Sequence, residues 1–331
     1  MGSPIDGSGS VSAAHDTLVD GVQVDRLDFE DESDVRERSG FEGRIGELVV
    51  DRYELTHLLG AGGSGAVYGA IDHLDSHRSR VAVKVLHKHL RSAVGHAARF
   101  QREIRALQQV AHSAVVRILD SGRSEDGNLF LVTELLEGEL LVDRMDEKGL
   151  DTREVLELGR QLLGALEAAH ERGIIHRDIK PENLFLVSAP SGSLRLKILD
   201  WGIAKLTQPD NAISFQTLDG LILGTPEYMS PEICRGMPVT EAVDLWAAAA
   251  VLYHIFTGSP PFEEEQIGRL LLKIVKERPT PLGELRPDLP GYVTAAIDRA
   301  LDRDPTRRWP SAQEFATGLA TSANIDDLDW D

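Results

Sequence analysis

The chain has 331 residues, of which 42% are hydrophobic, and its formal net charge is -19. This hydrophobic content is enough for one large domain or two ordinary ones. The negative charge opposes general binding to nucleic acid and to anionic membranes, so we expect neither as a partner. The single cysteine, Cys234, excludes an internal disulfide and fits a reducing compartment, which predicts a cytoplasmic location.

No stretch of the sequence predicts a membrane span. The longest apolar run, Leu245 to Phe256, is only a dozen residues long and contains His254. A helix needs about 20 apolar residues to cross a bilayer. The run therefore favours a buried helix.

The two ends of the chain are acidic. Residues 1–48 carry twelve acidic side chains and four basic ones without a helical or strand period, and residues 321–331 are also acidic. Low hydrophobicity with high net charge is typical of disorder, so the sequence predicts a disordered tail at each end. A docking or regulatory role for the first tail is the alternative.

The pattern between the tails changes once. From 49 to 136 the signals are mainly those of strands, with the apolar run Val81–Leu86, a hairpin signal at Asp126–Asn128 and one expected helix at about Ala97 to Gln109. From 137 to 320 the pattern is mainly helical. The sequence therefore predicts an α+β protein: a small, mainly antiparallel β lobe with one main helix, then a larger, mainly α lobe.

A glycine-rich segment, Gly60 to Val67, follows the first apolar strand residues. Glycines allow the backbone to approach phosphate oxygens closely and to present its N–H groups to them. By itself the segment is weak evidence for a nucleotide site, since a plain hairpin turn has the same pattern.

Lys84 ends the apolar run Val81–Lys84, which places a cation among apolar neighbours. A buried lysine is unfavourable unless an anion meets it, and either a phosphate or a carboxylate would serve. Glu103, on the helix expected in this lobe, is a candidate for that carboxylate. The alternative for Glu103 is a solvated position on the helix surface.

The most informative segment is His176–Leu184, in which an acid, a lysine and an asparagine occur at short offsets. An acid such as Asp178 can orient an incoming hydroxyl and accept its proton, and a lysine such as Lys180 can neutralise developing phosphate charge. Asn183 offers a carbonyl oxygen to a metal, and Asp200, directly after the next apolar strand, offers a carboxylate. Magnesium prefers oxygen ligands of this kind.

Taken in order, these motifs resemble those of the eukaryotic-like (Hanks-type) serine/threonine protein kinases, in particular the bacterial members, over about residues 53 to 318. The resemblance implies the bilobal kinase fold, with the small lobe at 49–136 and the larger at 137–320. It also implies transfer of the γ-phosphoryl group of ATP, bound with Mg²⁺, to Ser and Thr hydroxyls of protein substrates. The implied catalytic and metal-binding roles are Asp178 as base, Lys180 beside it, Lys84 paired with Glu103, and Asn183 and Asp200 as metal ligands.

By the same resemblance, ATP binds mainly in the first lobe. The implied phosphate loop consists of Gly60, Ala61, Gly62, Gly63, Ser64, Gly65 and Val67. The other implied nucleotide-binding residues are Ala82, Lys84, Thr133, Glu134 and Leu136. Either Leu184 or Phe185 would pack against the adenine ring from the second lobe.

Further along, the segment Gly224–Glu232 resembles the substrate-facing loop of the family. Thr225 in this segment, together with Lys180, is typical of the serine/threonine branch and not of the tyrosine branch. The resemblance also implies an ion pair between Glu232 and Arg308 and makes Asp244 the anchor of the catalytic loop.

The loop between Asp200 and Glu232, which includes this segment, is a candidate for regulation. Its candidate phosphosites are Ser214, Thr217 and Thr225. Related bacterial loops carry phosphothreonine at about the position of Thr217, so we expect autophosphorylation there in trans. Such a reaction requires at least a transient homodimer.

One residue departs from the family pattern. Trp201 stands where phenylalanine is usual, and its larger ring must pack beneath the helix that carries Glu103. We expect an effect on switching between active and inactive states and none on the chemistry.

Two other functions are compatible with parts of the pattern. A pseudokinase would keep the fold and bind partners without transferring phosphate, but no required group is missing here. A phosphotransferase for small molecules would share the acid and the asparagine of the catalytic loop. Lys180 and the segment Gly224–Glu232 argue against it because they form a surface for an extended peptide.

Overall fold

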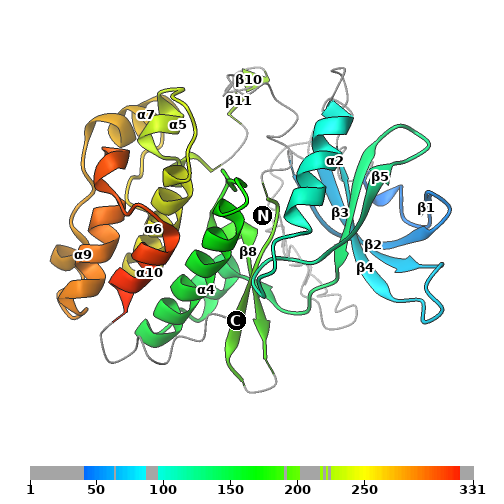
Figure 1. Ribbon diagram of the computed structural model, residues 1–331, viewed down its shortest axis with the longest axis horizontal. Helices are drawn as coiled ribbons and strands as arrows, with labels where there is room; N and C mark the ends of the chain where they lie inside the picture. The colour runs from blue at the N-terminus through cyan, green and yellow to red at the C-terminus, as the bar shows by residue number, and fades with distance from the viewer. Residues whose placement is uncertain are drawn as a thin grey trace, which may run out of the picture.

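The computed structural model describes residues 41–62, 65–86, 96–189, 192–201, 217–218, 221–222 and 225–320. For residues 96–99, 217–218 and 221–222 only the backbone is described. Figure 1 shows two lobes side by side, one formed mainly by strands and the other mainly by helices. The predicted α+β arrangement is confirmed.

Within the described residues, the first lobe holds a six-stranded antiparallel sheet in the order β1-β2-β3-β4-β6-β5. The predicted turn at Asp126–Asn128 joins the last two strands, and Gly127 there has φ 81°, which glycine adopts without steric cost. The strands are β1 (Leu48–Val49), β2 (Tyr53–Gly62), β3 (Gly65–Asp72), β4 (Arg80–Leu86), β5 (Ile118–Arg123) and β6 (Leu129–Glu134).

Strand β4 divides its side chains between two hydrophobic cores. The alternate valines from Val81 to Val85 belong to an outer core of the first lobe, whereas Leu86 belongs to the main core. Because successive strand residues point to opposite faces, Ala82 and Lys84 share the inner face with Leu86. The main core continues through helix α2 (His96–Leu107) into the second lobe and so joins the two lobes.

The second lobe is built around helix α4 (Thr152–His170), which packs against α6 and α10. A capping box begins α4: Asp151 accepts a hydrogen bond from the Glu154 N–H at 2.8 Å, and the Glu154 carboxylate accepts one from the Asp151 N–H at 2.9 Å. The other helices are α3 (Leu141–Glu147), α5 (Pro231–Cys234), α6 (Ala242–Thr257), α7 (Ile267–Lys276), α8 (Leu282–Leu285), α9 (Gly291–Ala300) and α10 (Ala312–Leu319).

Short elements complete the described part of the second lobe. Strands β7 (Glu139–Leu140), β8 (Leu184–Ser188) and β9 (Leu194–Ile198) form a small antiparallel sheet, and β10 (Thr217–Leu218) pairs with β11 (Leu221–Ile222). Three short 3₁₀ helices are η2 (Pro181–Asn183), η4 (Pro226–Tyr228) and η5 (Pro305–Arg307). Figure 1 shows β8 between α4 and the first lobe.

The apolar run Leu245–Phe256 forms the predicted buried helix, α6. Its residues from Val243 to Tyr253 are all buried. Gly258 ends the helix in the left-handed conformation, with φ 80°. Among the helices in the described part of the chain, none is both long and apolar enough to cross a membrane.

The structured first lobe begins earlier than predicted. The sequence predicts disorder over 1–48, but residues 41–42 are helical, residues 43–46 form turns and Leu48 begins β1. Phe41 packs against the outer core, and its carbonyl accepts a hydrogen bond from Tyr68 Oη at 3.0 Å. The prediction of disorder used the net charge of the whole segment. It could not show this contact because a single aromatic ring, that of Phe41, makes it. Residues 1–40 and 321–331 lie outside the described residues, so the tails there stay predictions.

Candidate active site

Strand register brings the glycine-rich segment next to Lys84. Gly60 on β2 pairs with Val67 on β3, and Val67 pairs with Lys84 on β4. Directly paired residues on neighbouring strands present their side chains to the same face, so Val67 and Lys84 share the inner face. Two residues before Lys84, Ala82 pairs with Thr133 on that face. The sheet therefore gathers these candidate nucleotide-binding residues.

Among the described glycines of the glycine-rich segment, Gly65 is the one whose backbone conformation and surroundings require glycine. Its φ is +143°, and a Cβ there would lie 2.1 Å from the Val85 carbonyl oxygen. Gly60 and Gly62 have open space around the position of a Cβ, so packing within the protein does not require glycine at either. The rest of the segment is Ala61, which contacts the outer core, and Gly63 and Ser64, which lie outside the described residues.

The candidate adenine-binding residues lie at the end of β6. Thr133 and Glu134 close this strand, and Leu136 follows it. Glu134 Oε1 accepts hydrogen bonds from Lys197 Nζ at 2.7 Å and from the Arg117 N–H at 2.9 Å. Burial raises the pKa of Glu134, but these two bonds outweigh it and hold the pKa below its ordinary value. Because the Glu134 carboxylate already accepts these two hydrogen bonds, we expect the backbone of Glu134, and not its side chain, to contact adenine.

Strand β8 separates the two candidates for the adenine ring. Leu184 is 1% exposed and belongs to the main core, whereas Phe185 is half-buried on the other face of the strand. A Cβ at Gly138 would lie 2.9 Å from the Phe185 ring. Gly138 closely follows Leu136, so Phe185 is the residue beside the candidate adenine segment.

Asp244, near the start of α6, anchors the catalytic loop as predicted. It is 1% exposed, and its carboxylate accepts hydrogen bonds from the backbone N–H groups of His176 and Arg177, each at 2.8 Å. Its Oδ2 also lies 2.9 Å from His170 Nε2, at the end of α4. The sequence reasoning missed His170. The available signal was a histidine at the buried end of a helix, shortly before the loop.

Asp178 and Asn183 are joined across the loop. Asn183 Nδ2 donates to the Asp178 carbonyl oxygen at 2.7 Å and to its carboxylate at 3.0 Å. The Asn183 carbonyl accepts a hydrogen bond from the Leu199 N–H at 2.8 Å, which brings the next residue, Asp200, beside the loop. The candidate base and the two candidate metal ligands therefore lie together.

Two residues of this region have left-handed backbones. Arg177 has φ 67° and Asp200 has φ 48°. For residues other than glycine this conformation costs roughly 1–2 kcal/mol. The hydrogen bond of the Arg177 N–H to Asp244 helps to hold the strained turn.

Lys180 reaches the substrate-facing segment. Its Nζ lies 3.4 Å from Thr225 Oγ1, and this hydroxyl donates to Glu182 Oε1 at 3.0 Å. One hydroxyl therefore links the catalytic loop to the segment. Glu182 is a second residue that the sequence reasoning missed.

Lys84 is paired with a different carboxylate from the one predicted. Its Nζ donates to Asp200 Oδ2 at 2.6 Å, and the two side chains are 8% and 41% exposed. Among the described residues, no ion pair joins Lys84 to the half-buried Glu103 of α2. In this structure Asp200 takes the place of the predicted partner, because the end of β9 brings its carboxylate close enough to compensate the buried ammonium. The Lys84–Glu103 pair stays a prediction.

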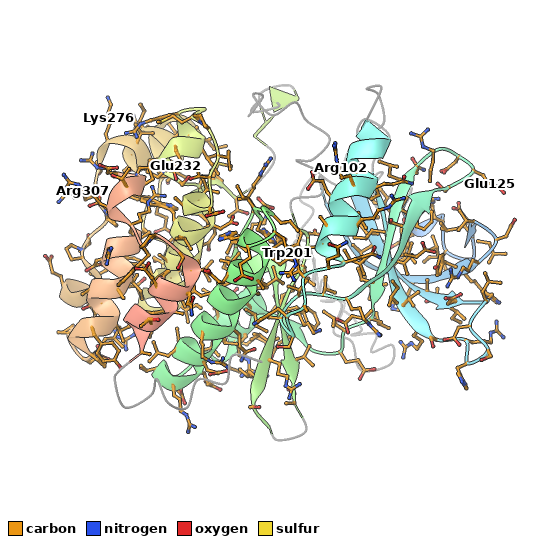
Figure 2. All side chains as sticks on the ribbon, in the orientation of Figure 1. Arg102, Glu125, Trp201, Glu232, Lys276 and Arg307 are labelled. Carbon is orange, nitrogen blue, oxygen red and sulfur yellow. The ribbon has the colours of Figure 1, made fainter. Side chains whose placement is uncertain are left out.

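Trp201 packs into the main core directly after Asp200. It is 3% exposed, and its ring lies tilted against that of His176, with centroids 4.9 Å apart. The same main core contains Phe100 and Ile104 of α2. Direct packing of Trp201 beneath that helix stays a prediction. Figure 2 shows Trp201 in the region where the two lobes meet.

The predicted pair of Glu232 with Arg308 is confirmed. Arg308 Nη1 and Nη2 donate to the two carboxylate oxygens of Glu232 at 2.6 and 2.8 Å. The two side chains are 0% and 5% exposed. Glu232 lies in α5, within the second lobe (Figure 2), so the pair ties the end of the substrate-facing segment to the rest of this lobe.

Of the candidate phosphosites, Thr217 lies in β10, where its backbone pairs with Ile222. Ser214 lies outside the described residues. Thr225 is half-buried, with its hydroxyl bonded as described above.

The oxygen donors of Asn183 and Asp200 fit magnesium. The side-chain nitrogen of Asn183 donates to Asp178. Its side-chain oxygen, Oδ1, is then the atom that can bind a metal. In the described part of the chain, no group of three His, Cys, Asp or Glu residues is placed to hold a metal. A site with few protein ligands is what magnesium uses when phosphate oxygens and water complete its coordination.

This bilobal fold, with a lysine of the sheet facing a loop that carries Asp178 and Asn183, defines a protein kinase. Residues 53–317 match the family model described as "Protein kinase domain". The chain therefore belongs to the protein kinase domain family.

Similar proteins come from bacteria. The chain is 40% identical over 278 residues to serine/threonine-protein kinase pkn2 of Myxococcus xanthus. The aligned region covers 83% of this chain and 33% of pkn2. The chain is 37% identical over 279 residues to serine/threonine-protein kinase pkn3 of the same organism, covering 83% and 50% of the two chains. The chain thus spans between a third and a half of the length of these relatives.

A solved structure shares the fold. The kinase domain of Mycobacterium tuberculosis PknI is 27% identical, with a TM-score of 0.64, over 83% of this chain and 97% of the other. The likeness agrees with the lobes described above.

Proposed function

We propose that this chain is the catalytic domain of a serine/threonine protein kinase, which transfers the γ-phosphoryl group of Mg-ATP to Ser and Thr hydroxyls of protein substrates. One observation carries the proposal: the candidate base, the two candidate metal ligands and the lysine of the other lobe are connected. Asn183 bonds to Asp178 and to the N–H of the residue before Asp200, and Asp200 meets Lys84. The printed names of the relatives support the same activity.

Each site residue receives a role from its chemistry. Asp178 orients the substrate hydroxyl and accepts its proton, and Lys180 neutralises charge on the transferring group. Asn183 and Asp200 hold Mg²⁺, and Lys84 holds phosphate oxygens. When bound, Mg-ATP supplies the phosphoryl group and the metal charge that balances it.

Nucleotide binding would also change the partner of Lys84. Asp200 cannot serve fully both as a magnesium ligand and as the partner of a buried ammonium. We therefore expect Lys84 to turn from Asp200 toward phosphate, with Glu103 of α2 as its carboxylate partner. The switch between the two arrangements would move α2 relative to β9.

The nucleotide would lie against the inner face of the sheet. Gly60 to Gly65 would cover the phosphates, and the remaining residues would surround the adenine: Val67, Ala82, Thr133, the backbones of Glu134 and Leu136, and Phe185 from the second lobe. The shared inner face of Val67, Ala82 and Thr133 supports this placement.

Thr217 is the best of the three candidate phosphosites for autophosphorylation in trans, through a transient homodimer. A phosphoryl group on Thr225 would place negative charge beside Glu182, whose carboxylate accepts the Thr225 hydroxyl. That repulsion argues against Thr225, while Ser214 stays a second candidate. Mass spectrometry of active protein that finds no phosphate on Thr217 or Ser214 would contradict the proposal.

We further propose lobes at about 41–136 and 137–320, a cytoplasmic location, and protein partners in place of nucleic acid or membrane. The order of strands and helices supports the lobe bounds. The single cysteine supports the location, and the net charge of -19 supports the choice of partners.

The test is incubation of purified protein with γ-labelled ATP and Mg²⁺, with myelin basic protein as acceptor and the Asp178→Asn variant beside it. Label on the parent and on the acceptor, lost in the variant, is the expected result. A parent that Mg-ATP stabilises against heat but that transfers no label would be a pseudokinase, and the proposal would fall.

A further inference from the structure

A tyrosine and a histidine form a pair beneath the substrate-facing segment that the proposed mechanism does not use. Tyr228 closes η4 and is 7% exposed, and its Oη lies 2.7 Å from Nδ1 of His254, in the last turn of α6. Their rings stack with centroids 6.1 Å apart and an angle of 23° between the planes. The segment therefore rests on a hydrogen bond to a titratable ring.

The surroundings of the pair set the direction of this hydrogen bond. Burial raises the pKa of Tyr228, and nearby carboxylates raise it further, so the phenol keeps its proton and donates. Burial lowers the pKa of His254 from its ordinary value of 6.5, and carboxylates oppose this only in part. The imidazole is then neutral at neutral pH, and Nδ1 accepts. The carboxylates that face the pair, from α3, η2, η4 and the chain after α6, are Asp146, Glu182, Glu227 and Glu263.

The substrate-facing segment is held at three points. At its start, the Thr225 hydroxyl bonds to Glu182 of the catalytic loop. At its end, the Glu232 carboxylate accepts hydrogen bonds from Arg308. Tyr228 lies between these two attachments, and η4 packs on both α6 and α7. The Tyr228 bond therefore attaches the middle of the segment to α6 by a side-chain hydrogen bond.

We propose that His254 is a positioning residue for protein substrates: by accepting the Tyr228 hydroxyl, it holds the substrate-facing segment in the geometry that binds the acceptor. The inference rests on the proposed kinase function. Lys84 and Asp200 are held by other contacts, so loss of His254 should weaken acceptor binding and leave ATP binding unchanged.

The first test separates the acceptor from ATP. His254→Leu removes the hydrogen-bond acceptor, whereas His254→Asn restores one near the position of Nδ1. We expect the KM for myelin basic protein to rise about 3- to 10-fold in His254→Leu, the range for one lost hydrogen bond, with the KM for ATP unchanged. His254→Asn should return it toward the parent value. An equal rise in both KM values, or no rise, would overturn the proposal.

A double variant and a control variant test whether Tyr228 and His254 act through the same hydrogen bond. Tyr228→Phe should reproduce the effect of His254→Leu, and the double variant should show no further loss because the two act through one bond. Tyr253→Phe is the control: its hydroxyl donates to the Thr280 carbonyl at 2.9 Å, away from the segment, so its KM for the acceptor should not change. Additive effects of Tyr228→Phe and His254→Leu would contradict a shared role.

The pH dependence of kcat/KM separates the proposed role from a purely structural one, because a purely structural role would not change it. As the pH falls through the pKa of His254, Nδ1 gains a proton and no longer accepts, so kcat/KM for the acceptor should fall on a limb below pH 6.5. His254→Asn should lack this limb. A limb that persists in His254→Asn would belong to another group and would overturn the proposal.

Two measurements do not require catalysis, so they separate this inference from the proposed function. In the Asp178→Asn background, the Kd for myelin basic protein should rise in His254→Leu and recover in His254→Asn. NMR titration should give His254 a pKa below 6.5, and Tyr228→Phe should raise it, because the lost donor had favoured the neutral ring. An unchanged Kd or an unchanged pKa would refute the positioning role even in a protein that transfers phosphate.

Discussion

Lys84 is an ammonium with only 8% of its side chain exposed, and its compensation depends on one contact to Asp200. We expect Lys84→Met to keep the fold, since the new side chain has a similar length and no charge to bury. Phosphoryl transfer should fall about 10²- to 10³-fold, the range for removing one electrostatic partner of a transition state. Labelled-ATP assays with thermal unfolding of the same samples check both parts. Turnover like that of the parent would refute the role of Lys84.

Asp200→Asn is the matched change on the other side of this pair. It leaves the ammonium buried without a full countercharge, so it should lower the unfolding temperature more than Lys84→Met does. A smaller shift for Asp200→Asn would mean that another carboxylate, such as Glu103, compensates Lys84.

Cys234, at the end of α5, should be chemically inert in the folded protein. Burial, with Glu232 as the next contributor, raises the pKa of this thiol to about 12. The thiolate is the reactive form, and almost none is present at pH 8. Iodoacetamide should therefore modify Cys234 slowly in the native protein and rapidly in urea, as mass spectrometry would show. Equal rates in the two conditions would contradict this environment.

At the scale of elements, the pair of Glu232 and Arg308 should contribute strongly to stability because both side chains are almost fully buried. Glu232→Ala leaves the guanidinium buried without its partner, and we expect a loss of about 3–5 kcal/mol in the free energy of unfolding. Glu264→Ala is the control: this carboxylate is 35% exposed in its pair with Lys273, so its loss should be about 1 kcal/mol or less. Urea unfolding compares the two variants, and similar losses would contradict the difference in burial.

In the first lobe, the ion pair of Arg52 with Asp72 joins the start of β2 to the end of β3 and makes stability depend on pH. Arg52 donates to both oxygens of Asp72, at 2.8 and 2.7 Å, and these bonds lower the pKa of Asp72. Because the folded pKa lies below the unfolded one, this stabilisation is present above the unfolded value, about 3.9, and is lost as the pH falls through the folded pKa. The parent should therefore exceed Asp72→Asn in stability at neutral pH, and the difference should shrink below about pH 4. A constant difference in urea unfolding between pH 7 and pH 3 would contradict it.

Elements with a strong local period could be predicted from the sequence, and contacts between distant elements could not. The alternation of Val81 to Val85 predicts β4, and the apolar spacing after Thr152 predicts α4. The partner of Lys84 escapes such reasoning because it depends on how β9 sits relative to α2. Leu184 and Phe185 are adjacent and both apolar, so only the face of β8 separates them.

On the scale of the whole molecule, the main core includes Phe100 and Ile104 of α2 together with Leu163 of α4 and Ala249 of α6. The main core therefore extends through both lobes, while the outer core belongs to the first lobe alone. We expect heat unfolding in a single transition, with equal calorimetric and van't Hoff enthalpies. Two resolved peaks in scanning calorimetry would show that the lobes unfold separately.

The register that aligns Gly60, Val67 and Lys84 also limits how the length of this chain can vary. One residue gained or lost in β4 before Lys84 would turn Lys84 from the inner face into the outer core, because the faces alternate at every residue of a strand. The same change within β3 would turn part of that strand over and break its pairing with β4. Extra residues in the hairpin between β8 and β9 leave the pairing on either side unchanged. Natural variants of this chain should therefore gain and lose residues at hairpin ends, while β3 and β4 keep a constant length.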